Sequence, residues 1–429
     1  MTDTPTEGWI LAGAVDGRPP GVSPLARCAG LPLVLRHACE LARAGCARAI
    51  VVWYGDAPPP DLAPLAADPR LAGCALSLVR DPEALSGGAG DVFVARADRV
   101  VHRDTFQVLA AAPAAPLRAI AGDDFDGAFA ASRQVARDLA AAAARPDGLR
   151  RAVAALRAQG RVVDAEPPYL GFCAPVVDRR SLRRAEWQLI RSLRKAADGF
   201  AARAINRHLS LPITWMLART PVRPNHITLL AFAAALMGGI TLARGGYWAG
   251  VAGMLWVELG SILDGVDGEL ARVTCRFSRV GQWMDTVTDD AANVCYWTGT
   301  MLNLQAAGVG WAMPVWSVAV AAFAITQLSQ YYLIATVYRS GDLAAIPWAF
   351  QSAEFLSARP RGFWPRVKAA VPKLLKRDFA VTLFCALAAA GRLDAVLAIS
   401  AAGAVSFLVA FCVQLVRARP EVAGGRRAA

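Results

Sequence analysis

The sequence predicts two parts: an α/β domain of Rossmann-like type in the N-terminal half and an all-α transmembrane domain of six helices in the C-terminal half. Its 429 residues are 55% hydrophobic, with a mean hydropathy of +0.35. The apolar residues are unevenly placed, because residues 1–220 mix charged and apolar side chains while long apolar runs dominate 226–417. A soluble domain fused to a membrane domain accounts for both observations.

Short apolar runs in the first hundred residues have the length and composition of buried β-strands. They are GWILAGA at 8–14, AIVVWYG at 49–55, ALSLV at 75–79 and DVFVARAD at 91–98. A helical pattern, PLVLRHACELARAG, lies between the first two at 32–45. Strands that alternate with helices are typical of a sheet covered by helices. We therefore expect an α/β domain over residues 1–185.

Residues 186–225 are expected to form a juxtamembrane helix that lies in the membrane interface. Apolar side chains alternate here with basic ones, which suits a helix whose arginines and lysines face lipid phosphates. The apolar set is Trp187, Leu189, Ile190, Leu193, Phe200 and Ile205, and the basic set is Arg191, Arg194, Lys195, Arg203 and Arg207. A soluble linker helix is the alternative.

The remaining residues, 226–429, contain apolar runs that predict six membrane spans. We place the spans near 226–243, 248–271, 281–304, 311–338, 378–391 and 393–416. A helix needs about 20 apolar residues to cross a bilayer, so the fifth segment is short.

The basic residues between the spans indicate the orientation of the chain. The connections after spans one, three and five carry only Arg244 and Arg392, whereas many arginines and lysines lie on the opposite side. Since cytoplasmic loops carry the excess of basic residues, we expect both termini on the cytoplasmic side of the inner membrane. Topology and anionic lipids then account for the net charge of +12. No basic stripe interleaved with aromatic residues predicts a nucleic-acid partner.

The first residues and the cysteines also bear on location. The start, MTDTPTEGWILAGAVDG, lacks the basic region and the long apolar core of a signal peptide, so we expect none. The nine cysteines show no paired spacing, and several lie inside apolar runs. They are typical of small buried residues in a reducing compartment.

Four aspartates in the run DGVDGELARVTCRFSRVGQWMDTVTD at 264–289 carry most of the functional information. Asp264 and Asp267 are three residues apart, and Asp285 and Asp289 are four apart, so each pair shares one face of a helix. Both pairs adjoin apolar segments, where an unpaired carboxylate is costly. Bound divalent cations would remove that cost. Because no Cys or His accompanies the acids, Mg²⁺, Mn²⁺ or Ca²⁺ is indicated rather than zinc.

The other residues of this run suit a phosphate ligand. Gly265 and Gly268 leave the backbone beside the acids uncovered, and Ala271, one turn on, is also small. Arg272 at the helix end can donate two hydrogen bonds to a phosphate. Gly281 opens the second helix close to the first. A cap or a packing glycine would explain any one of these residues, but not the whole set.

The spacing D-x-x-D-G-x-x-A-R, eight residues, then G-x-x-x-D-x-x-x-D resembles the signature of the CDP-alcohol phosphotransferases at every fixed position. The resemblance extends upstream to a P-N-x-x-T entry at 224–228 and covers roughly 190–417. It implies transfer of a substituted phosphate from a CDP-alcohol to an acceptor alcohol or phospho-alcohol, with release of CMP, in phospholipid or inositol-phosphate-type synthesis. It also implies Mg²⁺ or Mn²⁺, as two ions, and a homodimer in contact with membrane lipids.

The resemblance also assigns roles to residues of this sequence. The implied metal ligands are Asp264, Asp267, Asp285 and Asp289, and Asp289 is also the implied general base. Contacts to CDP are implied for Asn225, Thr228, Gly268, Ala271, Arg272 and Gly281. Helix capping is the alternative role of Asn225 and Thr228. An acceptor phosphate would be held by Arg276, Arg279 and the basic loop 359–377, whose alternative explanation is ordinary cytoplasmic-side charge.

The N-terminal domain resembles the sugar-nucleotidyltransferase-like fold, with departures at its nucleotide loop. The family loop L-A-A-G-x-G-x-R appears here as LAGAVDGR, with Ala14 and Asp16 in place of two glycines. The lysine of the family's K-P-L is Ser23, while Arg18 is retained and Asp98 follows a strand where a metal-binding aspartate is expected. The resemblance implies a degenerate domain without strong transferase activity. The two-domain order is that of the bifunctional inositol-1-phosphate cytidylyltransferase and di-inositol-phosphate phosphate synthase enzymes.

Two other functions stay open from the sequence. One is a non-enzymatic membrane protein that uses the acids as an ion site, although the alanine, arginine and glycine of the run have no purpose there and no inverted repeat is visible. The other is a bifunctional enzyme whose N-terminal domain makes the CDP-alcohol from CTP. Incubation with CTP and a sugar phosphate would distinguish this bifunctional enzyme from a phosphotransferase that does not make its own CDP-alcohol.

Overall fold

The structure is a computed structural model that describes residues 5–17, 21–85, 90–122, 126–194, 205–338, 343, 346 and 377–425. The chain divides into two compact units. The first consists of Met1–Ala196, Trp215–Pro221 and Arg272–Arg276, and the second of Ala197–Thr214, Val222–Ala271 and Phe277–Ala429.

The first unit is built on a seven-stranded sheet with the strand order β10-β8-β9-β6-β1-β4-β5. These strands are β1 (Glu7–Gly13), β4 (Arg48–Tyr54), β5 (Ala75–Val79), β6 (Asp91–Arg96), β8 (Leu117–Ile120), β9 (Ala128–Ser132) and β10 (Val162–Ala165). β1 pairs in parallel with β4 and β6, and β4 pairs in parallel with β5. β9 runs antiparallel to β6 and β8. The four strands predicted from the sequence therefore form the parallel side of the sheet, with β5 at its edge.

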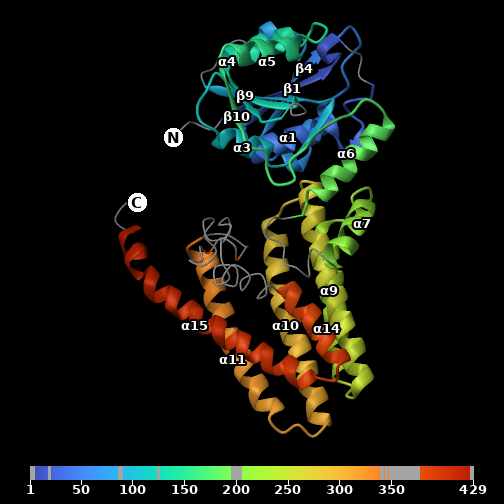
Figure 1. Ribbon diagram of the computed structural model, residues 1–429, viewed down its shortest axis with the longest axis vertical. Coiled ribbons are helices and arrows are strands. Elements are labelled where there is room, and N and C mark those ends of the chain that lie inside the picture. The colour runs from blue at the N-terminus through green and yellow to red at the C-terminus, as the bar shows by residue number, and fades with distance from the viewer. Residues whose placement is uncertain are drawn as a thin grey trace. The chain divides into compact units, whose positions relative to one another are not determined.

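Helices cover both faces of this sheet (Figure 1). Along β1, Trp9 and Leu11 enter one hydrophobic core and Ile10 and Ala12 enter the other, as the two-residue period of a strand requires. Parallel strands are normally covered by helices on both faces. Because this sheet is covered in that way, the predicted α/β class is confirmed. The helices of this unit are α1 (Leu33–Arg43), α2 (Ala63–Ala66), α3 (Thr105–Ala111), α4 (Arg133–Ala142), α5 (Gly148–Ala158) and α6 (Arg179–Arg191). Short strand pairs are β2 (Arg27–Cys28) with β3 (Leu31–Pro32), and β7 (Arg99–Val101) with β11 (Cys173–Pro175).

A short segment from the later sequence, Arg272–Arg276, folds as part of the first unit. Arg36 Nη1 donates to the backbone oxygen of Val273 at 3.0 Å, and both residues are buried. Cys275, which has a φ of 53°, lies in the same hydrophobic core as Leu35. This segment is therefore part of a core rather than a surface loop.

The second unit is made of helices. In the described part of the chain these are α7 (Arg207–Leu217), α8 (Pro224–Leu242), α9 (Tyr247–Val273), α10 (Arg279–Ala306), α11 (Ala312–Thr336), α14 (Arg377–Ala389) and α15 (Leu393–Gly425). Ser278 caps α10, since its Oγ accepts from the backbone nitrogen of Gly281 at 2.9 Å. Within the expected interfacial segment, α6 ends at Arg191 and α7 begins at Arg207, and residues 195–204 lie outside the described residues.

Four described helices, not six, are long and apolar enough to cross a membrane: Pro224–Leu242, Tyr247–Val273, Ala312–Thr336 and Leu393–Leu415. Within the described residues, two of the six predicted spans do not meet this criterion, for two physical reasons. α10 carries three aspartates and several amides among its 28 residues, so it is too polar. α14 has 13 described residues, and at 1.5 Å per residue it reaches about 20 Å of the ~30 Å hydrocarbon thickness.

α10 is nonetheless held closely against α8. A Cβ at Gly299 would lie only 2.3 Å from the backbone oxygen of Gly239, and a Cβ at Gly239 would lie 2.7 Å from the backbone oxygen of Cys295. Such backbone contact requires glycine and is common between membrane helices. The polar helix that carries Asp285 and Asp289 is thereby packed directly on an apolar one.

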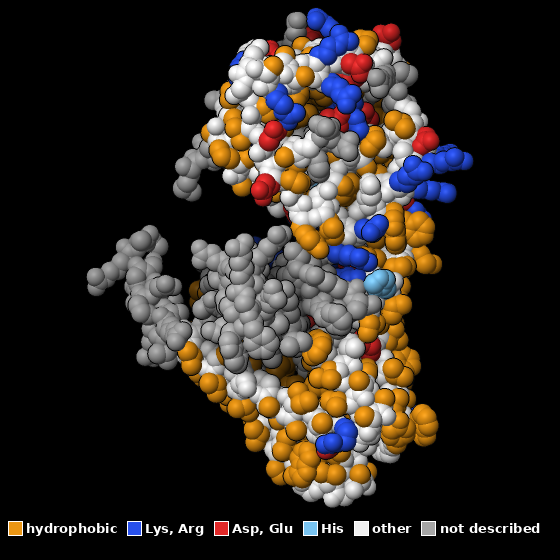
Figure 2. Space-filling model, in the orientation of Figure 1, with side chains coloured by type: hydrophobic (Ala, Val, Ile, Leu, Met, Phe, Trp, Pro, Cys, Tyr) orange, Lys and Arg blue, Asp and Glu red, His pale blue; other side chains and the backbone are white. Residues whose placement is uncertain are grey.

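Hydrophobic side chains cover much of the visible surface of the helical domain (Figure 2). Large apolar residues on α8, α9, α11 and α15 are exposed, among them Leu229, Leu236, Ile240, Leu255, Trp256, Val318, Ile325, Leu328 and Val409. An apolar surface of this extent is unfavourable in water and suits hydrocarbon. The helical part of the chain is an integral membrane domain.

Candidate active site

Three of the four predicted metal-ligating carboxylates converge. Asp264 and Asp267 lie on α9 and Asp285 lies on α10, and one carboxylate oxygen of each lies within 4.8 Å of the others. Asp267 is buried, whereas Asp285 is exposed. Three carboxylate oxygens at this separation suit a hard divalent cation. The residues present therefore fit the Mg²⁺ or Mn²⁺ that the sequence predicts.

A hydroxyl group from α8 orients one of these acids. Thr228 Oγ1 donates to Asp267 Oδ2 at 2.5 Å, and both side chains are buried. Thr228, for which the sequence predicts a nucleotide contact, therefore also lines the pocket beside a predicted metal ligand. A ligand that is hydrogen-bonded in this way is fixed in direction, which is how groups behind a metal site tune it.

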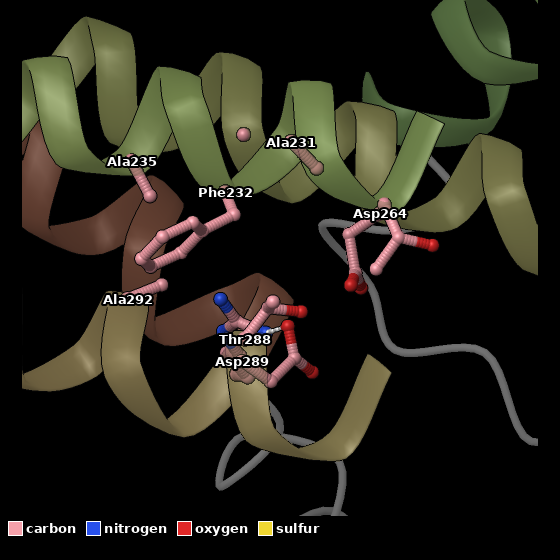
Figure 3. Close-up of a pocket in the computed structure, with 10 residues that line it drawn as sticks. Ala231, Phe232, Ala235, Asp264, Thr288, Asp289 and Ala292 are labelled. Carbon is pink, nitrogen blue, oxygen red and sulfur yellow. Dashed lines mark ion pairs between the residues drawn. The ribbon is translucent and has the colours of Figure 1, made fainter. Parts of the chain in front are cut away.

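The fourth acid, Asp289, faces a small pocket together with Asp264 (Figure 3). Arg377, the first residue of α14, also lines the pocket, and its guanidinium forms an ion pair with Asp289. The sequence places Arg377 only in a basic loop, because no local pattern shows that α14 returns to the acids. The other lining residues are Thr228, Ala231, Phe232, Ala235, Gly260, Thr288 and Ala292.

Asp290, the neighbour of Asp289, was not predicted to have a role. It binds α11, since its Oδ2 accepts from Gln327 Nε2 at 2.6 Å and from the hydroxyl of Tyr331. Successive residues are about 100° apart around a helix. The contact of Asp290 with α11 therefore fixes the rotation of α10 at which Asp289 faces the pocket.

The first unit contains a second acid cluster, at the predicted nucleotide loop. Asp16 is buried with a φ of 57°, and its Oδ2 accepts from Arg96 Nη1 at 2.7 Å while its Oδ1 accepts from the backbone nitrogen of Leu149 at 2.9 Å. In the sequence, Asp16 is one of two residues that replace glycines of the family loop. The structure turns this acid into the domain.

Arg96 also binds the predicted metal ligand of this domain, Asp98, through Nε at 2.9 Å and Nη2 at 2.8 Å. Asp126 lies 3.9 Å from Arg96 and is bound by Arg99 at 2.7 Å. Burial alone raises the pKa of Asp98, but the hydrogen bonds and charge of Arg96 outweigh it and hold that pKa below its usual value. A guanidinium thus supplies the positive charge at the centre of this cluster. Arg18 lies outside the described residues, and Ser23 Oγ accepts from the backbone nitrogen of Leu25 at 3.2 Å.

The helical acids lie in a region with known relatives. Residues 221–358 match the family model of CDP-alcohol phosphatidyltransferase. This region is a CDP-alcohol phosphatidyltransferase domain. The match includes α8, α9, α10 and α11, and so all four aspartates of the signature.

Three curated relatives of the chain are each named bifunctional IPC transferase and DIPP synthase. The protein from Thermococcus kodakarensis is 36% identical over 109 residues, 25% of this chain and 24% of the relative. The protein from Archaeoglobus fulgidus is 35% identical over 112 residues, 26% of this chain and 22% of the relative. The protein from Aquifex aeolicus is 27% identical over 135 residues, 31% of this chain and 30% of the relative. The chain therefore aligns with less than a third of each relative.

Two solved structures share some likeness with the chain. An inositol-1-phosphate CTP transferase from T. maritima has a TM-score of 0.32 at 10% identity, covering 44% of this chain and 98% of that one. HddC from Yersinia pseudotuberculosis has a TM-score of 0.29 at 13% identity, covering 42% of this chain and 98% of that one.

Two predicted CDP contacts of the phosphatidyltransferase domain are neighbours. A Cβ at Gly281 would lie 2.8 Å from Asn225 Oδ1, so the starts of α8 and α10 meet closely at this glycine. The other predicted contacts, Gly268, Ala271 and Arg272, lie in the last turns of α9, beside the first acid pair.

Of the predicted acceptor-phosphate residues, Arg377 lines the pocket, whereas Arg276 and Arg279 do not. Arg279 is exposed at the start of α10, and Arg276 belongs to the first unit, where its charge acts on Asp68. Neither is among the described residues that line the pocket. Residues 359–376 of the predicted basic loop lie outside the described residues.

Proposed function

We propose that this protein is a membrane-embedded CDP-alcohol phosphotransferase. The hydroxyl oxygen of an acceptor attacks the phosphorus that carries the donor alcohol, the bond from that phosphorus to the CMP oxygen breaks, and CMP leaves with the bonding electrons. The observation that supports this best is the convergence of Asp264, Asp267 and Asp285 from two helices inside a region that matches the family.

Two divalent cations, Mg²⁺ or Mn²⁺, would be held by Asp264, Asp267 and Asp285. The positive charge of the cations would stabilise the diphosphate as its bond breaks. Thr228 orients Asp267 for this task. Gly268, Ala271, Asn225 and Gly281 leave room for the nucleotide, and Arg272 can donate to phosphate oxygens.

Asp289 is our candidate for the general base that accepts the proton of the attacking hydroxyl. It lines the pocket beside Asp264, and its ion pair with Arg377 places a guanidinium next to the reacting groups. Arg377 is therefore our candidate for a phosphate contact, with Arg276, Arg279 and the rest of the 359–377 loop as weaker candidates.

We infer that donor and acceptor are of the inositol type, CDP-inositol with inositol or inositol phosphate. Support comes from the names of the relatives, each a bifunctional IPC transferase and DIPP synthase. CDP-diacylglycerol with a small alcohol is the second candidate, because the domain lies in lipid. We further propose that the protein is a homodimer in the inner membrane. Both termini and the acids would lie on the cytoplasmic side, since basic residues concentrate in the connections on that side.

We also infer that the α/β domain does not make the CDP-alcohol. Support comes from Arg96, which satisfies Asp16 and Asp98 within the domain. If this is right, the protein incubated with CTP and inositol 1-phosphate releases no pyrophosphate. Pyrophosphate release at a rate that matches CMP release would establish the bifunctional alternative.

The transfer proposal is tested by CMP release from the purified protein in nanodiscs. CDP-inositol or CDP-diacylglycerol is supplied with a panel of alcohols and with Mg²⁺ or Mn²⁺. We expect CMP release that needs both acceptor and metal, is abolished by EDTA, and is lost in Asp267→Asn, because one ligand charge is removed.

The matched control is Glu258→Gln, which alters another acid of α9. Glu258 accepts a hydrogen bond from Thr382 at 3.1 Å and is not part of the acid cluster. This variant should keep its activity. Undiminished turnover after EDTA treatment, or in folded Asp267→Asn, would disprove the metal role of the acids, and absence of CMP release with every donor and acceptor would disprove the proposed function.

A further inference from the structure

A fifth acid in the signature run has no role in the reaction described above. Glu269 lies on α9 two residues after Asp267, and its side chain is fully buried. A buried carboxylate in a membrane domain is costly unless several donors satisfy it. Its surroundings therefore need an explanation.

Three described residues donate to Glu269, and all three lie on one helix, α7. Arg207 Nη1 and Ser210 Oγ, the latter at 2.8 Å, donate to Oε1, and Thr214 Oγ1 donates to Oε2 at 2.6 Å. The three donors are spaced by three and four residues, so they form one face of α7. Ser210 and Thr214 are buried. Both carboxylate oxygens are thus bonded to the same face of one helix.

The geometry places this contact behind the acid cluster. At 100° per residue, Glu269 lies about 140° around α9 from Asp264 and about 160° from Asp267. Gly265 lies one turn before Glu269 on the same face, and a Cβ there would be 3.7 Å from Arg207 Nη1. The guanidinium therefore runs along the back of the turn whose front carries Asp264 and Asp267.

We propose that Glu269, Arg207, Ser210 and Thr214 form a positioning network that sets the rotation of α9 and so brings Asp264 and Asp267 to Asp285. On this inference, which rests on the proposed function, α7 is part of the transfer site although it carries no metal ligand. The network acts from the back of α9, while Thr228 holds Asp267 from α8. An apolar contact of the same size would be cheaper to bury but would not define one rotation.

The test compares metal binding and turnover in Glu269→Gln. This variant keeps the side-chain volume but removes the charge that Arg207 binds. We expect about a 10–100-fold weaker affinity for Mn²⁺ and a similar rise in the metal concentration for half-maximal turnover, the usual size of effects behind metal ligands. Mn²⁺ binding is measured by electron paramagnetic resonance on the full-length protein without substrate. Arg207→Lys should retain more affinity than Arg207→Met.

The control is again Glu258→Gln, another α9 acid, which should bind Mn²⁺ like the wild type. If Glu269→Gln does not fold, Ser210→Ala and Thr214→Val each remove one donor and keep the charge pair, and each should weaken Mn²⁺ binding measurably. Wild-type affinity in the folded variants would overturn the inference. Mn²⁺ binding is measured without substrate, so it does not depend on the proposed reaction. If the proposed reaction is wrong, the protein will bind Mn²⁺ normally but will release no CMP.

Discussion

Replacing Arg96 by methionine would test whether its guanidinium is the cation of the α/β domain's acid cluster. Methionine keeps an apolar stem and removes the charge. The side chain of Asp16 is only 7% exposed and would keep one backbone donor, that of Leu149. The side chain of Asp98 is 31% exposed and would regain water more readily.

The expected loss follows from this difference in burial. Removing one partner of a buried ion pair costs about 3–5 kcal/mol, whereas an exposed pair adds only ~0–1 kcal/mol. We therefore expect the domain to lose about 3–5 kcal/mol of its free energy of unfolding near neutral pH, nearly all of it from Asp16. Replacing Asp16 by asparagine in the same chain removes the unpaired charge and should restore about 1–3 kcal/mol.

The pH dependence has a definite sign. The pKa of Asp98 is lower in the folded than in the unfolded domain, because Arg96 favours its charged form against the effect of burial. The stability from this pair is therefore present above about pH 4 and is lost as the pH falls through the lower, folded-state pKa. Arg96→Met should lack this acid-sensitive contribution.

Hydrogen exchange of peptides from β1 and β6 in the full-length protein measures the opening free energy of this domain alone. The matched control is Arg157→Met, which removes an exposed ion pair with Asp164, 46% and 42% exposed, and should cost ~0–1 kcal/mol. A loss below about 1 kcal/mol in Arg96→Met, or no recovery in the double variant, would refute the reasoning.

Three further outcomes are expected. Asp289→Asn should lower kcat by about 10²–10⁴-fold with little change in KM for the CDP-alcohol, and an equal loss of binding would assign Asp289 to the metal alone. Gly299→Ala should destabilise the helical domain by about 1–3 kcal/mol, because the added Cβ would meet the backbone oxygen of Gly239. Gly310→Ala is the control, since the space around Gly310 is open, and it should not destabilise the domain. The two variants are compared by their rates of thermal inactivation. Burial lowers the pKa of His37 to about 4, below its ordinary 6.5, so the α/β domain should lose stability as the pH falls from about 6.5 toward 4, and His37→Gln should flatten that slope in hydrogen exchange.

Local patterns were enough to predict the elements that depend on nearby residues. The four parallel strands β1, β4, β5 and β6 follow from short apolar runs, and the pairing of Asp264 with Asp267 on one helix face follows from spacing alone. The number of spans could not be predicted from local patterns, because the apolar half of α10 was counted as a span without the polar residues of the same helix.

The partners of the site residues could not be predicted, because they lie far away in the sequence. Thr228 and Asp267 are 39 residues apart, and Arg96 and Asp16 are 80 apart. Nothing in a single sequence indicates that a threonine will donate to one acid rather than cap its own helix. Glu269 was the exception that could have been noticed, since a fifth acid beside an apolar run needs donors of its own.

The segment Val273–Cys275 gives the spacing of the signature a physical meaning. Surface loops usually tolerate insertions, but these residues, between the two acid pairs, are buried with Arg36 and Leu35 in the core of the α/β domain. An added residue here would have to shift a buried carbonyl off Arg36 or expose Cys275. The eight-residue interval between Arg272 and Gly281 thus contains residues that an insertion would displace from a core, and a protein engineer who shortens the chain at its N-terminus would need to supply a new partner for that buried segment.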